Sequence, residues 1–351
     1  MELNTLRKKI DKIDGDILEL LSDRMEIAVR TKKLKNEVSD EQREKDVMTK
    51  ISSKSKGLIS NAFSQKLFQE IMSESKRLQK ENLKLIGFQG EHGAYSEMAV
   101  KTHDPNSVAI PCSDFTEVFQ SVKNGQLDLG IVPIENSLAG QINDVNDLLI
   151  QYDLKIVGEV RVPVHHCLLA PPETDYREIK MVYSHPQALA QCRGFTERNK
   201  LEARPYYDTA GAAMMVAKDK PNGAAAIASK LCAELYDLEV LKENVEDHTS
   251  NTTRFVVLSK DYSKEVGNKC SIIFSTAHKP GALFEIIKLF YESKTNLTRI
   301  ESRPVPNDPG KFVFLVDFQG SDKDKKIAEL LERIKKESPT FKFLGCYKEA
   351  I

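Results

Sequence analysis

The chain has 351 residues, of which 29% are charged, and its formal net charge is −1. This length predicts two or three domains with full hydrophobic cores, and the balanced charge argues against a nucleic-acid-binding protein because there is no global basic field. The six cysteines include no Cys-x-x-Cys pair, which argues against a disulfide scaffold. The first segment is charged, unlike a signal peptide, and no apolar run approaches the roughly 18 residues that a membrane span needs. These features predict a cytoplasmic protein.

Residues 1–82 contain no proline, and their apolar side chains recur in steps of three and four, which predicts an all-helical region. On the first helix Arg24 falls in the middle of the apolar sector, Lys35 lies close beside it and Arg7 flanks it. A cation on a core face costs free energy unless it meets an anion, so each could pair with a carboxylate across a coiled coil. Because several polar groups converge on apolar faces, we favour a pocket for a dicarboxylate inside a helical bundle.

From Leu83 onward, short apolar runs alternate with helical stretches, which is typical of an α/β fold. Polar residues follow two of these runs, in Pro133-Ile134-Glu135-Asn136-Ser137 and in Ser184-His185-Pro186-Gln187. Ligands of α/β sheets bind at the carboxyl ends of strands, so both segments are candidate binding residues. Asp208-Thr209-Ala210 precedes an alanine-rich helix and could simply cap it. His165-His166-Cys167 does not predict a metal site, because neighbours on a strand point to opposite faces.

Residues 249–258 place hydroxyl groups and one cation directly before Phe255-Val256-Val257-Leu258, an apolar run that predicts a buried strand. Arg254 could hold a carboxylate through two hydrogen bonds, and Thr253 could hydrogen-bond a leaving oxygen. The alternative is a capped turn before a core strand. Each polar segment is weak evidence by itself, but their order along the chain is more informative.

The last region, after a polar linker at 261–268, predicts strand, helix, strand, strand, helix, strand, the order of a ferredoxin-like α+β fold. Gly281-Ala282-Leu283-Phe284 opens the first helix, where exposed amides favour a ligand carboxylate. Glu301-Ser302-Arg303-Pro304 ends the following strand. Helix capping and an edge-strand proline would explain either motif singly, but not the pair.

Together, in this order, the motifs resemble those of the bifunctional chorismate mutase–prephenate dehydratases. The resemblance implies a multidomain protein, with an all-α mutase domain at 1–82, a two-lobed α/β, periplasmic-binding-protein-like dehydratase domain at 84–260, and a ferredoxin-like ACT regulatory domain at 268–351. It implies conversion of chorismate to prephenate and then to phenylpyruvate, carbon dioxide and water, with feedback inhibition by L-phenylalanine. It further implies a homodimer or higher homo-oligomer that needs no cofactor or metal. Two alternatives remain, an arogenate dehydratase and a non-catalytic solute-binding sensor.

For the mutase, the resemblance implies that Arg24, together with Arg7 of a partner subunit, binds the two substrate carboxylates. Lys35 and Gln79 would donate to the ether oxygen, and Glu44 would orient the ring hydroxyl. These groups suit a rearrangement that needs a compact conformer and charge complementarity rather than a nucleophile. The remaining residues of this predicted site are Asp40, Arg43 and Ser75.

For the dehydratase, the resemblance to the Thr-Arg-Phe signature implies that Thr253 acts at the leaving hydroxyl and that Arg254 anchors a carboxylate. Either Glu135 or His185 could supply a titrating acid. Asp208 stands where many relatives have a small hydroxyl residue. The predicted substrate-binding set is Glu135, Asn136, Ser137, Ser184, His185, Gln187, Thr209, Arg254 and Phe255. The predicted phenylalanine-binding set is Gly281, Ala282, Leu283, Glu301, Ser302 and Arg303.

Overall fold

The structure is a computed structural model that describes residues 3–35, 40–305 and 311–350. The chain separates into two compact units, one formed by residues 1–85 with 125–127 and the other by 86–124 with 128–351. In the described part of the chain, no helix combines the length and the apolar character that a membrane span requires.

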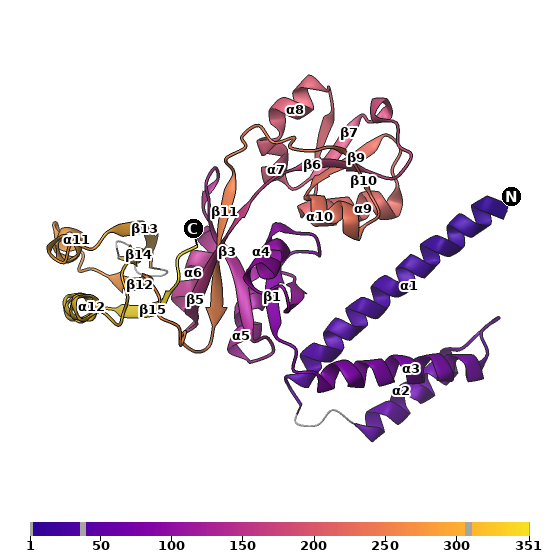
Figure 1. Cartoon of the computed structure of the whole chain (residues 1–351), viewed down its shortest axis with the longest axis horizontal. Coiled ribbons are helices and arrows are strands. Elements are labelled where there is room, and N and C mark those ends of the chain that lie inside the picture. The colour runs from indigo at the N-terminus through magenta and orange to yellow at the C-terminus, as the bar shows by residue number, and fades with distance from the viewer. Residues whose placement is uncertain (1–2, 36–39, 306–310, 351) are drawn as a thin grey trace. The chain divides into compact units, whose positions relative to one another are not determined.

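The first unit consists of three helices, α1 (Leu3–Lys32), α2 (Glu41–Lys54) and α3 (Asn61–Lys80), and both α1 and α2 pack against α3 (Figure 1). Side chains of Asp40 and Ser60 accept hydrogen bonds from backbone amides at the starts of α2 and α3, so both helices are capped. The predicted apolar stripe of α1 is present, but within the described residues its side chains are exposed. They are Leu3, Leu6, Ile10, Ile13, Ile17, Leu20 and Ile27.

The second unit begins with a sheet in the order β2-β1-β3-β11-β5, with β4 paired to β3. Strand β11 is antiparallel to both β3 and β5, so the segment that follows residue 250 lies inside this sheet, between two other strands. The bounds are β1 (Leu85–Gln89), α4 (Tyr95–His103), β2 (Val108–Cys112), α5 (Phe115–Lys123), β3 (Leu129–Asn136), β4 (Gly140–Gln141), α6 (Asn143–Gln151), β5 (Lys155–Pro163) and β11 (Thr252–Ser259).

A second sheet has the order β10-β6-β9-β7-β8, and the chain passes between the two sheets from β5 to β6 and back from β10 to β11 (Figure 1). All five residues of its central strand β9 are buried, as expected of a strand covered on both faces. The bounds are β6 (Cys167–Ala170), η1 (Tyr176–Glu178), β7 (Met181–Ser184), α7 (Pro186–Gln191), α8 (Arg193–Arg198), β8 (Glu202–Pro205), α9 (Thr209–Asp219), β9 (Ala224–Ala228), α10 (Lys230–Leu235) and β10 (Glu239–Lys242).

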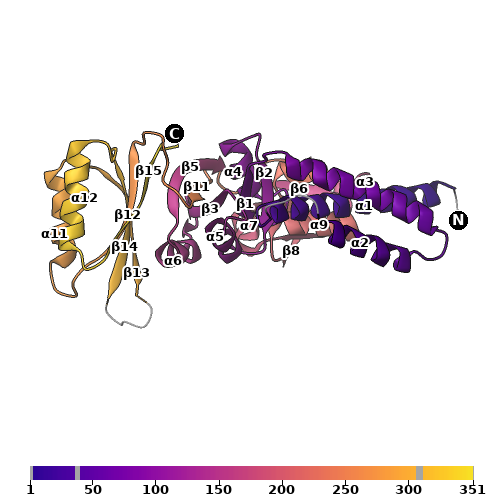
Figure 2. The same ribbon diagram turned by 90° about the horizontal axis from the view of Figure 1, so that it is seen from below.

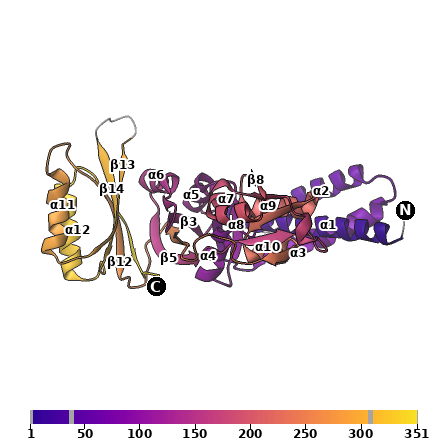
Figure 3. The same cartoon turned by 90° about the horizontal axis from the view of Figure 1, so that it is seen from above.

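The third sheet, in the order β13-β14-β12-β15, carries α11 and α12 on one face, as Figures 2 and 3 show. Apolar side chains of these helices and strands form a separate core. The opposite face carries buried polar groups, among them Ser271, Asp317 and Tyr347. The bounds are β12 (Lys269–Ser275), α11 (Ala282–Glu292), β13 (Leu297–Pro304), β14 (Phe312–Gln319), α12 (Lys325–Glu337) and β15 (Phe341–Tyr347).

The three-part fold expected from the sequence is confirmed: helices first, then two α/β lobes, then a βαββαβ region. These helices and strands could be predicted because hydrophobic periodicity depends only on residues that are close together in the sequence. The domain boundaries at 1–82, 84–260 and 268–351 stay predictions. The contacts between the third sheet and the first include buried ion pairs, among them Arg254–Asp317 and Glu159–Lys269.

Candidate functional sites

In the helical unit, the predicted mutase residues Arg24, Ser75 and Gln79 make contacts between α1 and α3. Arg24 of α1 donates from Nη1 to Oγ of Ser75 on α3, at 2.5 Å. Gln79 donates from Nε2 to the carbonyl oxygen of Ala28, at 2.7 Å. Partial burial lowers the pKa of Arg24 below its usual value. A half-buried guanidinium held between two helices can still accept a substrate anion, because Ser75 is neutral and leaves the charge uncompensated.

The other predicted mutase residues do not contact Arg24, Ser75 or Gln79 in the hydrogen bonds and ion pairs of the described residues. Glu44 on α2 pairs with Lys76 of α3, with 2.8 Å between Nζ and Oε1. Asp40 caps α2 by accepting from the amide of Arg43, at 2.9 Å, and Lys35 is exposed. Arg7 precedes Arg24 by 17 residues on one continuous helix, so about 25 Å separates them along the axis. Within one chain, therefore, Arg7 and Arg24 cannot bind the same small molecule.

In the second unit, Thr253 lies in a buried polar cluster that we name the Thr253 cluster: Tyr95, Asn136, His166, Gln191, Asn251 and Thr253. Asn136, at the end of β3, is paired with Thr253 on β11. Its Nδ2 donates to Oγ1 of Thr253 at 2.9 Å and to Oδ1 of Asn251 at 2.8 Å. Its Oδ1 accepts from the amides of Leu138 and Ala139, which fixes the orientation of the amide group. Asn136 donates to Oγ1, and no acceptor of the Thr253 hydroxyl hydrogen is seen among the described residues, so this hydrogen is available for donation.

The cluster continues into the second lobe through His166 and Gln191, which were not predicted as site residues. Asn251 Nδ2 and His166 Nε2 both lie within hydrogen-bond distance of Oε1 of Gln191, at 3.1 and 2.9 Å. The hydroxyl of Tyr95 lies 3.0 Å from Nδ1 of His166. Burial lowers the pKa of His166, which favours the neutral ring. The amide oxygen of Gln191 can only accept, so Nε2 of His166 is the donor in that hydrogen bond. Gln191 ends a six-residue helix, and nothing in its local sequence distinguishes it from a surface glutamine.

The other predicted substrate-binding residues of the two lobes make contacts that stabilise helices, strands or the core. Ser137 joins the start of β11, because Oγ accepts from the amide of Thr252 at 3.0 Å. Ser184 is fully buried and donates to the carbonyl oxygen of Ile227. His185 caps α7 by accepting from the amide of Gln187, and Thr209 begins α9 beside its N-cap, Asp208. Phe255 belongs to the core cluster that spans both lobes.

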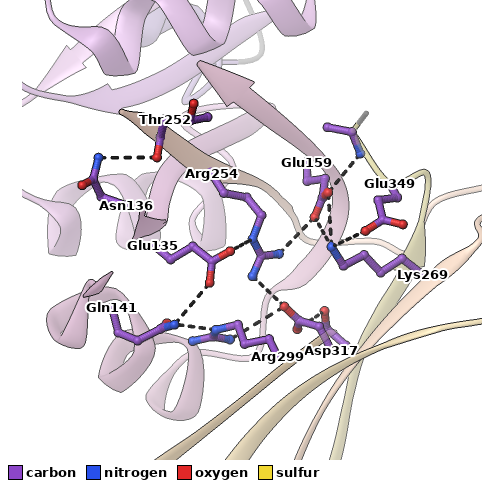
Figure 4. Close-up of polar contacts among 12 residues, drawn as sticks. Glu135, Asn136, Gln141, Glu159, Thr252, Arg254, Lys269, Arg299, Asp317 and Glu349 are labelled. Atoms are coloured by element: carbon purple, nitrogen blue, oxygen red, sulfur yellow. Dashed lines mark hydrogen bonds and ion pairs between the residues drawn. The ribbon is translucent and has the colours of Figure 1, made fainter. Parts of the chain in front are cut away.

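The role expected for Arg254 is not supported by its surroundings (Figure 4). Its guanidinium is 3% exposed and faces three protein carboxylates. Nε donates to Glu135 at 2.7 Å, Nη1 to Glu159 at 3.0 Å and Nη2 to Asp317 at 2.8 Å. Burial by itself would lower the pKa of Arg254, but Asp317 and the other carboxylates raise it above the usual value. Protein carboxylates thus occupy three of the five N–H donors of the guanidinium, which disfavours the expected contact with a substrate carboxylate; that role stays a prediction.

We name this group the buried ion cluster: Glu135, Glu159, Arg254, Lys269, Arg299 and Asp317. Lys269 Nζ donates to Glu159 at 3.0 Å, and Nη1 of Arg299 lies 3.9 Å from Asp317. Burial raises the pKa of Asp317, but Arg254 and Arg299 outweigh this and lower it. Glu135 likewise has its pKa lowered, since Arg254 outweighs the effect of burial. An ionised Glu135 facing Arg254 is a poor candidate for the titrating acid.

The Thr253 cluster and the buried ion cluster lie on opposite faces of one strand. Successive side chains of a β-strand alternate between the faces of its sheet. Register agrees with this: Thr253 is paired with Asn136, and Arg254 with Glu135. Thr253 therefore faces the polar groups shared by the two lobes, whereas Arg254 faces β14 of the third sheet.

A pocket of about 530 Å³ lies in the third sheet's domain, at the start of α11. Three residues of the predicted phenylalanine set line it, Gly281, Ala282 and Leu283. Gly281 has a φ of 84°, in the left-handed region that favours glycine. Phe284 and, from β14, Phe312 and Phe314 supply aromatic walls. The size and the apolar lining suit one aromatic side chain.

The other half of that predicted set divides between the two faces of β13. Ser302 is paired with Phe314, so it lies on the pocket's face of the sheet. Glu301 and Arg303 lie on the opposite face, towards the first sheet. Arg303 donates to both carboxylate oxygens of Asp147 on α6, each at 2.8 Å. The structure therefore does not bring Glu301 and Arg303 to the pocket of their own chain, contrary to expectation.

No group of three or more His, Cys, Asp or Glu side chains in residues 3–35, 40–305 and 311–350 is arranged to hold a metal ion. His165 and His166, which adjoin in sequence, have different partners. His165 Nδ1 lies 2.8 Å from Glu246, while the ring of His166 belongs to the Thr253 cluster.

Comparison with known proteins assigns a family to all three regions. Chorismate mutase type II matches residues 6–80, Prephenate dehydratase matches 86–263, and the ACT domain matches 271–336. A bifunctional chorismate mutase/prephenate dehydratase of Pseudomonas aeruginosa is 36% identical over 100% of this chain and 98% of that protein. The chain belongs to this bifunctional family. An arogenate dehydratase/prephenate dehydratase of Arabidopsis thaliana is 38% identical over 75% of this chain and 72% of its own length.

Solved structures match the dehydratase fold of this bifunctional enzyme. A prephenate dehydratase of Arthrobacter aurescens in complex with L-Phe aligns with a TM-score of 0.70 and 31% identity, covering 76% of this chain and 90% of its own. A protein described as a quorum quenching acylase aligns with a TM-score of 0.71 and 34% identity, covering 76% and 98%. One dehydratase-like fold thus carries more than one described activity, so the site must support the function.

Proposed function

We propose that this chain rearranges chorismate to prephenate in its helical unit and converts prephenate to phenylpyruvate in its α/β lobes, under control by L-phenylalanine. The observation that carries the proposal is the buried Asn136–Thr253 hydrogen bond, which leaves one hydroxyl hydrogen free at the junction of two lobes. Membership of a family of enzymes disfavours the solute-binding sensor. The roles below rest on residue chemistry and on the expected site.

For dehydration, the C–O bond to the ring hydroxyl and the bond to the ring carboxylate both break, and the released electrons form the aromatic ring. Water and carbon dioxide leave, and one proton must reach the departing hydroxyl. Thr253 donates its hydrogen to that oxygen, while Asn136 holds Oγ1 in place. Of the two acids considered, His185 remains the candidate source, because Glu135 is ion-paired on the other face of the sheet.

For the rearrangement, a second copy of the chain completes the site. The apolar stripe of α1 has no partner in the described residues, and Ile10 and Ile13 are 57% and 56% exposed. A large exposed apolar face on a helix favours burial against another helix. Antiparallel packing of two α1 helices would place Arg7 of one copy near Arg24 of the other, so that two guanidinium groups bind the two carboxylates.

For regulation, the aromatic pocket beside Gly281 is the proposed place of the phenylalanine ring. Amides at the start of α11 suit the ligand's carboxylate. Ser302 lies on the same face of the sheet and is the nearest polar member of the predicted set. Glu301 and Arg303 face away in the same chain, so their proposed contact with ligand requires a neighbouring subunit or a change in β13.

One assay tests the proposal: purified full-length protein is incubated with chorismate, and both chorismate loss and phenylpyruvate formation are followed. Prephenate and arogenate are then supplied separately, with and without L-phenylalanine. We expect prephenate to be consumed and L-phenylalanine to reduce its consumption. Turnover of arogenate alone would favour arogenate dehydration, which the Arabidopsis relative's name includes. No turnover of any of the three would refute the proposal.

A further inference from the structure

The third sheet contacts the catalytic strand through charges that are shielded from water. Asp317 on β14 is 2% exposed in its side chain, Arg254 on β11 is 3%, and Glu159 on β5 is 0%. Opposite charges buried at hydrogen-bond distance interact strongly, and removing one partner leaves the other uncompensated. The pair Arg254–Asp317 is therefore sensitive to the relative position of β11 and β14.

Asp317 is held from both sides. One oxygen, Oδ2, accepts from Arg254 at 2.8 Å, and the other, Oδ1, accepts from the hydroxyl of Ser271 on β12 at 2.7 Å. The same hydroxyl lies 2.7 Å from that of Tyr347 on β15. Three strands of the third sheet thus fix the carboxylate to which the catalytic strand is attached.

Arg254, which Asp317 holds, is the residue that follows the proposed catalytic residue Thr253. Thr253 and Arg254 share a peptide bond, so a displacement of Arg254 moves the backbone of Thr253. The hydrogen bond from Asn136 to Thr253 is 2.9 Å, and a shift of about 1 Å in a reacting group can cost on the order of 100-fold in rate. The rate of dehydration should therefore depend on the position of β11, which carries Thr253.

The same strand of the third sheet also lines the regulatory pocket. Phe312 and Phe314 of β14 border the pocket, and Asp317 lies three residues beyond Phe314 on the opposite face. Three residues of strand span about 10 Å. A ligand that repositions β14 at Phe314 therefore acts on Asp317 through a short and stiff connection.

We propose that Asp317 is a positioning residue for dehydration: it holds Arg254, thereby sets Thr253 against Asn136, and transmits the state of the pocket beside Phe314 to the catalytic strand. This inference rests on the proposed function. It assigns a part in the reaction to a residue of the regulatory domain that touches no substrate. It also gives Arg254 a role that its three carboxylate partners permit.

The test compares Asp317→Asn with wild type in the full-length chain. Asparagine keeps the size and can still accept from Ser271, but it removes the charge that faces Arg254. We expect kcat for supplied prephenate to fall about 10- to 100-fold with little change in KM, because placement rather than binding is lost. Chorismate consumption, which uses the other unit, should stay unchanged. An unaltered kcat for prephenate would overturn the inference.

A double-mutant cycle tests whether Asp317 acts through Arg254. In an Arg254→Gln background, Asp317→Asn should lower kcat no further, because the pair is already broken. Fully additive losses would contradict the positioning role. Lys342→Gln is the matched control, since Lys342 also joins the third sheet to the first lobe, through the carbonyl oxygens of Leu149 and Tyr152 at the end of α6, but makes no hydrogen bond to the buried ion cluster in the described residues. Its kcat for prephenate should match wild type.

Two further measurements keep the outcomes distinct. If Asp317→Asn lacks the cooperative thermal transition of the second unit, Ser271→Ala is used in its place. This variant removes the hydrogen bond from the Ser271 hydroxyl to the Asp317 carboxylate, so an unchanged kcat for prephenate would again contradict the inference. L-phenylalanine should bind Asp317→Asn in calorimetry yet change its kcat less than that of wild type; an undiminished change in kcat would refute the transmission. Wild type that does not turn over prephenate refutes the proposed function, whereas wild type insensitive to L-phenylalanine refutes only its regulation.

Discussion

Thr253 and Arg254 are neighbours in sequence but belong to different surroundings. One accepts a hydrogen bond from Asn136 between the lobes, and the other is enclosed by Glu135, Glu159 and Asp317. The sequence indicated that both residues matter, because hydroxyls and a cation precede an apolar strand. It could not show what Arg254 meets, since Asp317 lies 63 residues away and belongs to another sheet. Side-chain alternation applies to both, but their partners depend on long-range pairing.

At the same scale, Thr253→Val should abolish most dehydration. Valine preserves the shape of the side chain but cannot donate to a leaving hydroxyl, so prephenate turnover should fall about 100- to 10,000-fold. Chorismate consumption in the same preparation is the internal control, and it should persist. A Thr253→Val enzyme with wild-type kcat on prephenate would leave this residue a purely structural role.

Arg24→Ala should have the converse effect. Loss of a preorganised cationic contact in the helical unit should reduce chorismate consumption about 100- to 1000-fold. Supplied prephenate should be converted at the wild-type rate. The matched control is Arg77→Ala, because Arg77 is an exposed arginine of α3 that pairs only with nearby Glu74 and Glu81 in the described residues. Equal losses in both variants would mean that the effect of Arg24 is not specific.

His166 should make the second unit sensitive to mild acid. Burial holds its pKa below 6.5, so the unfolded chain binds more protons than the folded one once the pH falls beneath that value. The contribution of His166 to the free energy of unfolding is therefore fully present above about pH 6.5 and is lost as the pH drops towards the pKa of the folded state. Between pH 7.5 and 5.5, the thermal midpoint of wild type should fall more than that of His166→Gln. Parallel curves would show that Glu246 and other groups dominate instead.

At the scale of elements, α1 shows what periodicity can and cannot predict. Steps of three and four correctly predicted an amphipathic helix, and the structure extends it over Leu3–Lys32. The stripe nevertheless remains exposed, because its place in the assembly depends on another surface. Gln191 and His166 were missed for a related reason: a glutamine at the end of a short helix becomes informative only when Asn251 lies beside it.

Ile13→Glu on α1 should break the proposed association of two chains. A charge in the middle of an apolar contact must be desolvated without a partner, so the variant should sediment as a monomer and lose mutase activity. Leu18→Glu is the control, since Leu18 is also exposed but is displaced by about 100° from its neighbour Ile17 around the helix. Ile13→Glu that remains dimeric and active would place the interface elsewhere.

For the whole molecule, the decisive feature is that one domain interface contains a cluster of buried charges beside apolar side chains such as Ile273 and Leu315. Composition indicated only a balanced total charge. Hydropathy patterns describe Asp317 and Lys269 poorly, because each is a charged residue inside an otherwise apolar strand. Such positions become interpretable when their partners are known, as Arg254 and Glu159 are here.

Gly345→Ala should separate the third sheet from the first. Gly345 of β15 has a φ of 148°, and a Cβ there would collide with the carbonyl oxygen of Ile156 on β5, so the sheets must move apart. We expect slower prephenate turnover with unchanged chorismate consumption. Gly125→Ala is the control, because Gly125 also has a positive φ, 73°, but open space around its Cβ. Full activity of Gly345→Ala would show that the sheets need not remain in contact.

The charged interface also has an evolutionary consequence. A recombination that removes the first 85 codons leaves every member of the buried ion cluster in the gene, because all of them lie in the second compact unit. A break in the linker at 261–268 would instead cut the buried ion pairs Arg254–Asp317 and Glu159–Lys269, so that each product would keep groups that have lost a buried partner. Gene fission and fusion should therefore occur more readily before residue 86 than between the dehydratase and its regulator.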